Sequence, residues 1–204
     1  MTIARKARSL IRRMRDQFAL AAADPEMFAR NVSQFTHRRL YEERLLDVLV
    51  TTPLRIRIDG EQSPPALNVL QPISSVLGMT GGPNTVIHVA AEIAAQGIPV
   101  RILTDRPVPT GGFAWFGHHL KEIGAASISP SQLRIVPASD PRRPAMIGPS
   151  DIFLATHWTT AQQANDILPK MQRKFFFYLI QDYEPAFYAW SSNYALAAAT
   201  YSMN

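Results

Sequence analysis

The sequence has no cysteine among its 204 residues. This absence excludes a disulfide-stapled scaffold, a thiol nucleophile and a cysteine-ligated metal, and it fits a reducing compartment. There is no GxSxG nucleophile motif, no GxGxxG fingerprint and no P-loop lysine. No HExxH or equivalent metal-binding spacing links the five histidines, which are His37, His88, His118, His119 and His157. We therefore expect no metal ion and no other cofactor.

Residues 61–204 have no excess of positive charge. Residues 1–60 contain 12 Lys and Arg against 7 Asp and Glu, whereas residues 61–204 contain 9 of each. Because no basic stripe with interleaved aromatic residues follows residue 60, we expect no nucleic-acid partner. Arginines also interrupt every apolar run near the N-terminus that would suit a signal peptide or a membrane span. The sequence thus disfavours a secreted or an integral membrane protein.

Residues 1–60 are predicted to form a basic helical N-terminal extension. In residues 1–22, apolar side chains recur at helical spacing among basic ones. Three interpretations stay open: a helix packed on its own protein, a helix lying on an anionic membrane surface, and a transit peptide. A second helix is predicted to begin at Pro25, and Leu54–Asp59 is predicted to be a short strand or an extended connector. The composition of residues 60–65 indicates a linker and a domain boundary.

The pattern after this linker predicts a strand, a helix and a parallel strand. Leu67–Leu70 reads as a buried strand, Gly78–Gly82 as a glycine loop, and Pro83–Gln96 as an amphipathic helix that ends at Gly97. The next strand is Val100–Thr104. The loop of this unit gathers free backbone N–H groups at the positive end of a helix.

The alternation continues to the end of the chain. The later elements are predicted as a helix Phe113–Ile123, a strand Leu133–Val136, a loop Ser139–Pro149, a strand Asp151–Ala155 that leads into Thr156-His157-Trp158 and a helix through about Met171, a strand Phe175–Ile180 and a helix Pro185–Tyr201. The continuous apolar run Phe175–Ile180 is typical of a central parallel strand covered on both faces. Residues 66–204 therefore predict an α/β fold, a Rossmann-like parallel sheet with helices on both faces.

Three segments with chemically useful residues follow strands of this sheet, and we expect them to meet in one cleft. In the first segment, Gly81 and Gly82 permit close approach of a ligand to the backbone. Asn84 and Thr85 present donors in the first turn of the next helix. The alternative is that the glycines only turn the chain.

The second and third segments carry the candidate catalytic residues His157 and Asp182. His157 can donate to a phosphate or sugar hydroxyl or act as a base, or it can simply cap the next helix. Asp182 and Glu184 can orient a sugar hydroxyl or serve as a base. Nearby aromatic rings can form a floor for a pyranose, or they can be core or interface residues. The candidate substrate-binding residues are Gly81, Gly82, Asn84, Thr85, Trp158, Tyr183, Glu184 and Tyr188.

Three runs together resemble the N-terminal domain of a GT-B glycosyltransferase. They are LNVL at 67–70 with GGPNT at 81–85, DIFLATHWTT at 151–160, and YLIQDYEPAFY at 178–188. The resemblance spans residues 66–203 and is to the bacterial rhamnosyltransferases of glycosyltransferase family 4, which build S-layer and cell-surface rhamnan glycans.

This resemblance implies two Rossmann-like domains that face each other across a cleft. The N-terminal domain would bind the glycan acceptor, and the C-terminal domain would bind the nucleotide sugar, dTDP-rhamnose. Transfer of rhamnose to a bacterial surface polysaccharide would be metal-independent and retaining. Gly81 and Gly82 match the glycine loop, and His157 matches a strand-end position near the cleft. Gln181 and Asp182 stand where many members carry a histidine, so a base role does not transfer from that histidine.

The resemblance also implies partners and a location. Because the donor-binding domain is absent from the sequence, we expect a truncated or split enzyme, inactive alone, whose partner is the missing domain or a second polypeptide. The expected location is cytoplasmic, with residues 1–22 as a peripheral contact to the inner face of the plasma membrane. Two other functions stay open. One is a non-enzymatic carbohydrate- or partner-binding module, and the other is a nucleotide-binding oxidoreductase in which Asp105 would bind ribose rather than form a turn.

Overall fold

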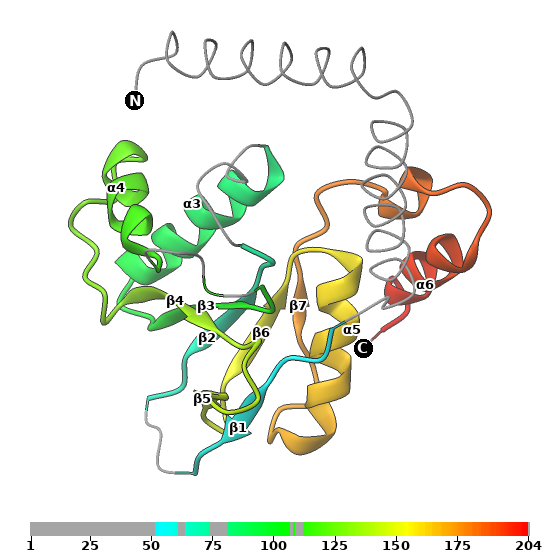
Figure 1. Ribbon diagram of the computed structural model, residues 1–204, viewed down its shortest axis with the longest axis horizontal. Helices are drawn as coiled ribbons and strands as arrows, with labels where there is room; N and C mark the ends of the chain where they lie inside the picture. The colour runs from blue at the N-terminus through cyan, green and yellow to red at the C-terminus, as the bar shows by residue number, and fades with distance from the viewer. Residues whose placement is uncertain (1–51, 61–63, 74–80, 107, 109–111, 204) are drawn as a thin grey trace, which may run out of the picture. The chain divides into compact units, whose positions relative to one another are not determined.

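A computed structural model describes residues 52–60, 64–73, 81–106, 108 and 112–203 (Figure 1). The predicted helices of residues 1–22 and from Pro25 onward lie outside these residues, as do Gly78, Met79 and Thr80 of the glycine loop. The strands are β1 (Ile56–Ile58), β2 (Leu67–Leu70), β3 (Val100–Thr104), β4 (Leu133–Pro137), β5 (Ala145–Ile147), β6 (Ile152–Ala155) and β7 (Phe177–Tyr178). The helices are α3 (Gly82–Ala95), α4 (Ala114–Glu122), α5 (Trp158–Ile167), α6 (Ser192–Thr200), and the 3₁₀ turns η2 (Leu168–Lys170) and η3 (Glu184–Phe187).

Five of these strands form one parallel sheet in the order β4-β3-β2-β6-β7. Helices α3 and α4 cover one face, and α5 covers the other (Figure 1). This is the α/β Rossmann-like architecture that the alternating pattern predicts. Helix α3 begins with Pro83 in its first turn, and Gly97, at a φ of 84°, follows its last residues as expected.

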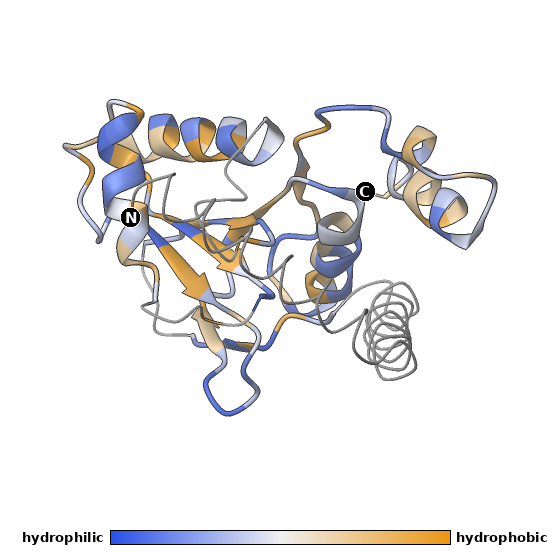
Figure 2. Cartoon of the chain, turned by 45° about the horizontal axis from the view of Figure 1, so that its top comes forward, coloured by the Kyte–Doolittle hydropathy of each residue, from blue (hydrophilic) through white to orange (hydrophobic). Residues whose placement is uncertain are grey.

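Alternate residues of the central strands enter two separate cores. Leu67 and Val69 pack with α3 and α4, whereas Leu70 packs with α5 on the opposite face. The same alternation divides Ile102 from Leu103 on β3. Because both faces are covered, most residues of the central strands are apolar, as hydropathy colouring shows (Figure 2). The buried polar residues of β2 and β3 are Asn68, Arg101 and Thr104.

A buried carboxylate ties the amino ends of the central strands together. Asp151, 2% exposed, accepts hydrogen bonds from the backbone N–H groups of Ala66 and Gly148, both at 2.8 Å. It also accepts from the amide of Asn68 at 3.0 Å and pairs with the guanidinium of Arg101. Desolvation lowers the pKa of Arg101, and the charge of Asp151 opposes that shift. The network fixes where β2, β3 and β6 begin.

The predicted loop Ser139–Pro149 contains a strand, so the expectation of a loop is wrong there. Residues Ala145–Ile147 form β5, which pairs in parallel with β1 and places Ile56 beside Ala145. Leu54, Ile56 and Ile58 pack on the core that α5 covers. Strand β1 precedes the predicted boundary at residues 60–65, and its partner lies in the sheet-containing part of the chain.

The prediction that Phe175–Ile180 is a central strand is also wrong. The strand β7 has only two residues, Phe177 and Tyr178, and it lies at the edge of the sheet. Phe177 is 54% exposed, and Phe175 and Ile180 are exposed as well. An apolar run of this length is compatible with an edge strand as well as with a central strand, because the hydropathy pattern does not show which strands lie beside it.

The predicted last helix, Pro185–Tyr201, is divided into η3 and α6. Residues 188–191 interrupt it, and the side chain of Ser191 accepts the backbone N–H of Tyr194 to cap α6. Within the described residues, no helix is long and apolar enough to cross a bilayer.

Candidate functional site

A pocket of about 450 Å³ opens at the carboxyl edge of the sheet. It joins the start of α3, the start of α5 and the segment after β7, which are the three segments that the sequence places there. Its lining residues are Gln71, Pro72, Gly82, Pro83, Thr85, Thr156, His157, Gln181, Asp182, Glu184 and Phe187. The predicted convergence of Gly82, His157 and Asp182 on one cleft is therefore confirmed.

The first turn of α3 forms one wall of this pocket. Gly81 occupies the N-cap with a φ of 57°, a conformation that L-residues with a side chain rarely adopt, and no side chain caps the helix. A Cβ on Gly82 would lie 2.9 Å from Oε1 of Gln181. Gly82 thus lets the backbone of α3 approach the side chain of Gln181 after β7, and Gly81 supplies the backbone conformation at the N-cap. The start of a helix carries partial positive charge, which suits an anionic ligand.

His157 caps α5 and also lines the pocket. Its Nδ1 accepts the backbone N–H of Thr159 at 3.3 Å, and the hydroxyl of Thr159 lies 2.8 Å away. A nitrogen that accepts a backbone N–H carries no proton, so the neutral ring holds its proton on Nε2. Burial lowers the pKa of His157 more strongly than the nearby Glu184 carboxylate raises it, which favours this neutral form. The prediction that His157 caps the next helix is confirmed, and the same residue lines the pocket.

Glu184 has a structural contact where the sequence predicts a substrate contact. Its Oε2 accepts the backbone N–H of Trp158 at 2.6 Å and the hydroxyl of Tyr178 at 2.8 Å, and the residue is 3% exposed. The carboxylate therefore occupies the positive end of α5, and that helix end is closed to a phosphate. Burial raises the pKa of Tyr178, whose hydroxyl stays protonated and donates to Glu184.

The aromatic residues divide into the pair Trp158 and Tyr188 and an exposed group. The buried Trp158 donates through Nε1 to the hydroxyl of Tyr188 at 2.9 Å, and the two rings meet edge to face at 5.9 Å. Neither residue lines the pocket, so this pair braces η3 against α5 instead of forming a sugar floor. Tyr183 is 55% exposed and packs beside Tyr201, whereas Phe187 lines the pocket.

Three further predicted residues differ in their placement. The exposed carboxylate of Asp182 lines the pocket, and its Oδ1 accepts the backbone N–H of Tyr183 at 2.7 Å. Thr85 also lines the pocket, and its hydroxyl donates to the Gly81 carbonyl at 3.3 Å. Asn84 does not line it, because its Oδ1 lies 2.9 Å from Nε2 of His119 and links α3 to α4.

Sequence reasoning missed Gln71 as a pocket residue, and it placed Thr156 and Gln181 in the predicted segments without giving them a role. Gln71 and Thr156 follow β2 and β6 directly, and the hydroxyl of Thr156 donates to both Oε1 of Gln71 and the carbonyl of Leu70. The rule that ligands gather beyond the carboxyl ends of parallel strands, applied to every strand, would have found them. Asp105 accepts the amide of Gln163 at 3.2 Å and does not line the pocket. In the described part of the chain, no group of three or more His, Asp or Glu side chains is arranged to hold a metal ion.

Comparison with known families identifies the domain. The family model described as "WsaF, N-terminal domain" matches residues 66–204, which is more than half of the chain. The chain belongs to this family. The WsaF N-terminal domain is a glycosyltransferase-associated domain from S-layer glycosylation, so the predicted glycosyltransferase-like N-terminal domain is confirmed. No curated protein matches the chain.

Membership of the WsaF N-terminal domain family relates the pocket to glycosyl transfer. The chain has a glycosyltransferase-related role in surface glycan synthesis. The pocket offers donors at the start of α3, an imidazole N–H from His157 and an exposed carboxylate from Asp182. A donor, an acceptor and a helix end in one pocket suit a ligand that carries both hydroxyls and an anionic group.

Proposed function

We propose that this domain is the acceptor side of a rhamnosyltransferase of the glycosyltransferase family 4 type. It would help to move rhamnose from a nucleotide sugar, dTDP-rhamnose, to a bacterial surface polysaccharide. The observation that carries this proposal is the meeting of the α3 start, His157 and Asp182 in a single pocket. Membership of the WsaF N-terminal domain family supports it at the level of a glycosyltransferase.

In this proposal, Asp182 and His157 hold the acceptor sugar. The Asp182 carboxylate accepts a hydrogen bond from the reacting hydroxyl and takes its proton as the new glycosidic bond forms. The Nε2–H of His157 donates to a second oxygen of the acceptor. Because His157 uses Nδ1 to cap α5, it acts as a hydrogen-bond donor and not as the base.

The open start of α3 faces the leaving group. As the bond between the sugar and the nucleotide diphosphate breaks, negative charge grows on the diphosphate oxygens. Backbone N–H groups at the start of a helix stabilise such charge, and Gly81 and Gly82 allow the diphosphate to come close to them. Glu184 closes the corresponding end of α5, so α3 is the helix that serves this role.

The remaining contacts to the nucleotide sugar would come from a donor-binding domain that faces the pocket. That domain would belong to the same polypeptide or to a second one. Residues 1–22 are proposed to hold the protein at the cytoplasmic face of the plasma membrane through their basic side chains. Liposome co-sedimentation of the full chain with and without anionic lipid tests this location, and binding that ignores lipid charge would contradict it.

The function is tested by isothermal titration of the full chain with a rhamnose-containing oligosaccharide. We expect the oligosaccharide to bind, and Asp182→Asn to weaken or abolish rhamnosyl transfer measured after a donor-binding domain is added. The matched control is Asp166→Asn, since Asp166 is an exposed aspartate on α5 that does not line the pocket. The proposal would be refuted if the chain showed no binding and no transfer, both alone and with the donor-binding domain added. Binding without transfer would favour a carbohydrate-binding module.

A further inference from the structure

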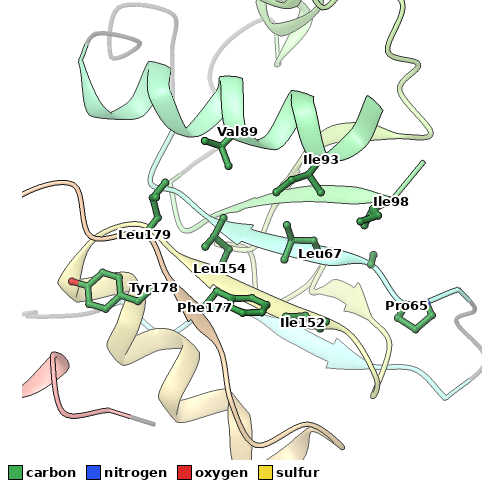
Figure 3. A pocket seen from close by; sticks show the side chains of 11 residues that line it. Pro65, Leu67, Val89, Ile93, Ile98, Ile152, Leu154, Phe177, Tyr178 and Leu179 are labelled. Carbon is green, nitrogen blue, oxygen red and sulfur yellow. The ribbon is translucent and has the colours of Figure 1, made fainter. Parts of the chain in front are cut away.

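The polar pocket begins where strands β2 and β6 end. A neighbouring hollow, of about 460 Å³ between α3 and the β6–β7 side of the sheet, has a mainly apolar lining that includes Leu67 of β2 and Leu154 of β6 (Figure 3). Farther along the same two segments, Gln71 and Thr156 line the polar pocket instead. These two side chains are therefore the polar groups that follow the carboxyl ends of the central strands.

Gln71 is held in one orientation by its backbone and its side chain. Its backbone N–H donates to the carbonyl of Leu103 at 3.0 Å, and its carbonyl accepts the N–H of Ile73 at 2.8 Å. The hydroxyl of Thr156 donates to Oε1 of the side chain. The residue is only 7% exposed, and close packing around a buried side chain restricts its rotation.

The amide nitrogen of Gln71 is a donor that the fold does not use. Because Oε1 faces Thr156, Nε2 keeps two N–H groups, and in the described part of the chain no group accepts a hydrogen bond from them. Nε2 is not completely enclosed, so it reaches the pocket that the residue lines. A nearly buried amide donor without an acceptor costs free energy, which a ligand oxygen in the pocket would recover.

Gln163 shows how this fold satisfies a glutamine that has a structural role. It is 4% exposed, and its Nε2 donates to the carbonyl of Thr52 at 2.6 Å and to Oδ2 of Asp105 at 3.2 Å. The amide nitrogen of Gln163 thus has acceptors within the protein, whereas that of Gln71 faces the pocket. This difference assigns Gln71 to ligand binding.

We propose that Gln71 determines specificity for the acceptor sugar by donating a hydrogen bond from Nε2 to one of the sugar hydroxyl oxygens. The inference rests on the proposed function, which assigns the acceptor sugar to the pocket, and it adds a residue that selects this sugar. Among the described residues that line the pocket, Asp182 and Glu184 carry carboxylates and none is a lysine or an arginine. An uncharged donor in these surroundings suits a neutral hydroxyl better than the carboxylate of an acidic sugar.

The test is a nuclear magnetic resonance titration of the full chain with methyl rhamnoside and with analogues that each lack one hydroxyl group. Loss of the hydroxyl that Gln71 contacts should weaken binding to the wild-type chain about 2- to 13-fold, the equivalent of one hydrogen bond. Gln71→Met should bind methyl rhamnoside more weakly by the same factor, and loss of that hydroxyl should then have no further effect. If the two effects simply multiply for every analogue, the inference is overturned.

Gln163→Met is the matched control for stability. It should lower the melting temperature by about 2–4 °C, the effect of one lost hydrogen bond, and leave the affinity for methyl rhamnoside unchanged. Gln71→Met should do the reverse, because the hydroxyl of Thr156 keeps the carbonyl of Leu70 as its acceptor. An equal fall in melting temperature in both variants, with affinity unchanged in both, would show a structural role and overturn the inference.

Gln71→Glu tests the direction of the hydrogen bond, and it replaces Gln71→Met if that variant does not fold. At about pH 7 its ionised carboxylate cannot donate, so methyl rhamnoside should bind more weakly than to the wild-type chain. Near pH 5 protonation, which burial favours, supplies a donor and should bring the affinity closer to that of the wild-type chain. His157, Asp182 and Glu184 also titrate in this pocket, so the two proteins are compared at each pH. Binding at pH 7 as strong as in the wild-type chain would refute a donor at this position.

The outcomes separate this inference from the proposed function. If Asp182→Asn weakens the binding of methyl rhamnoside and Gln71→Met does not, the proposed function stands and the inference fails. If methyl rhamnoside does not bind the wild-type chain, both fail.

Discussion

Two substitutions at His157 separate its contribution to the helix from its contribution to the pocket. His157→Ala removes the Nδ1 that accepts the backbone N–H of Thr159, and alanine is a poor N-cap. We expect a loss of about 1 kcal/mol in the free energy of unfolding, within a range of about 0.5–2 kcal/mol. For a domain of this size, that loss corresponds to a melting temperature lower by about 2–4 °C.

His157→Asn is the matched variant, because an asparagine oxygen can accept the same N–H. We expect it to cost less than about 0.5 kcal/mol. Both variants lose the ring contact between His157 and Trp158, at 5.7 Å, so that this loss cancels in the comparison. Both also lose Nε2–H, and we expect both to bind the acceptor about 2- to 13-fold more weakly, the equivalent of one hydrogen bond.

The assays are urea unfolding followed by far-ultraviolet circular dichroism, and titration with the acceptor. The slope of free energy against urea should be the same for all three proteins, since the cap changes little exposed surface. Equal destabilisation of the alanine and asparagine variants would refute the capping role. Binding of wild-type strength by either variant would refute the role of Nε2–H in the pocket.

Three further predictions follow from the same contacts. Burial lowers the pKa of His157, so the folded state binds fewer protons than the unfolded state, and stability should fall as the pH drops below about 6.5. The urea midpoint at pH 7.5 and 5.5 measures this fall. His157→Asn should make the fall smaller. Asp151→Asn removes the carboxylate that pairs with the buried Arg101 and should cost about 3–5 kcal/mol in thermal unfolding, whereas a loss below about 1 kcal/mol would contradict the network. Gly82→Ala should displace the Gln181 side chain and weaken acceptor binding in titration while the unfolding midpoint changes little, because alanine favours a helix; unchanged binding would show that Gln181 does not shape the pocket.

The local pattern of the sequence determined most of the elements and the edge at which the pocket lies. The buried run Leu67–Leu70, the proline-started helix after it and the strand Val100–Thr104 were predicted within one or two residues. Parallel strands place their carboxyl ends on one edge, so that the meeting of Gly82 with the later segments also followed from the sequence. These features depend on contacts of short range or on a general rule of topology.

Only the tertiary structure decided the features that depend on which neighbour a segment meets. It placed β7 at the edge of the sheet, because an apolar run has the same pattern whether or not a further strand covers it. It paired β1 with β5 across nearly ninety residues. In the folded chain, Glu184 accepts a hydrogen bond at the start of α5, and Asn84 contacts His119. Two residues predicted to bind a ligand therefore make contacts within the protein instead. A polar side chain binds whichever partner the fold brings within hydrogen-bond distance, and that partner lies far away in the sequence.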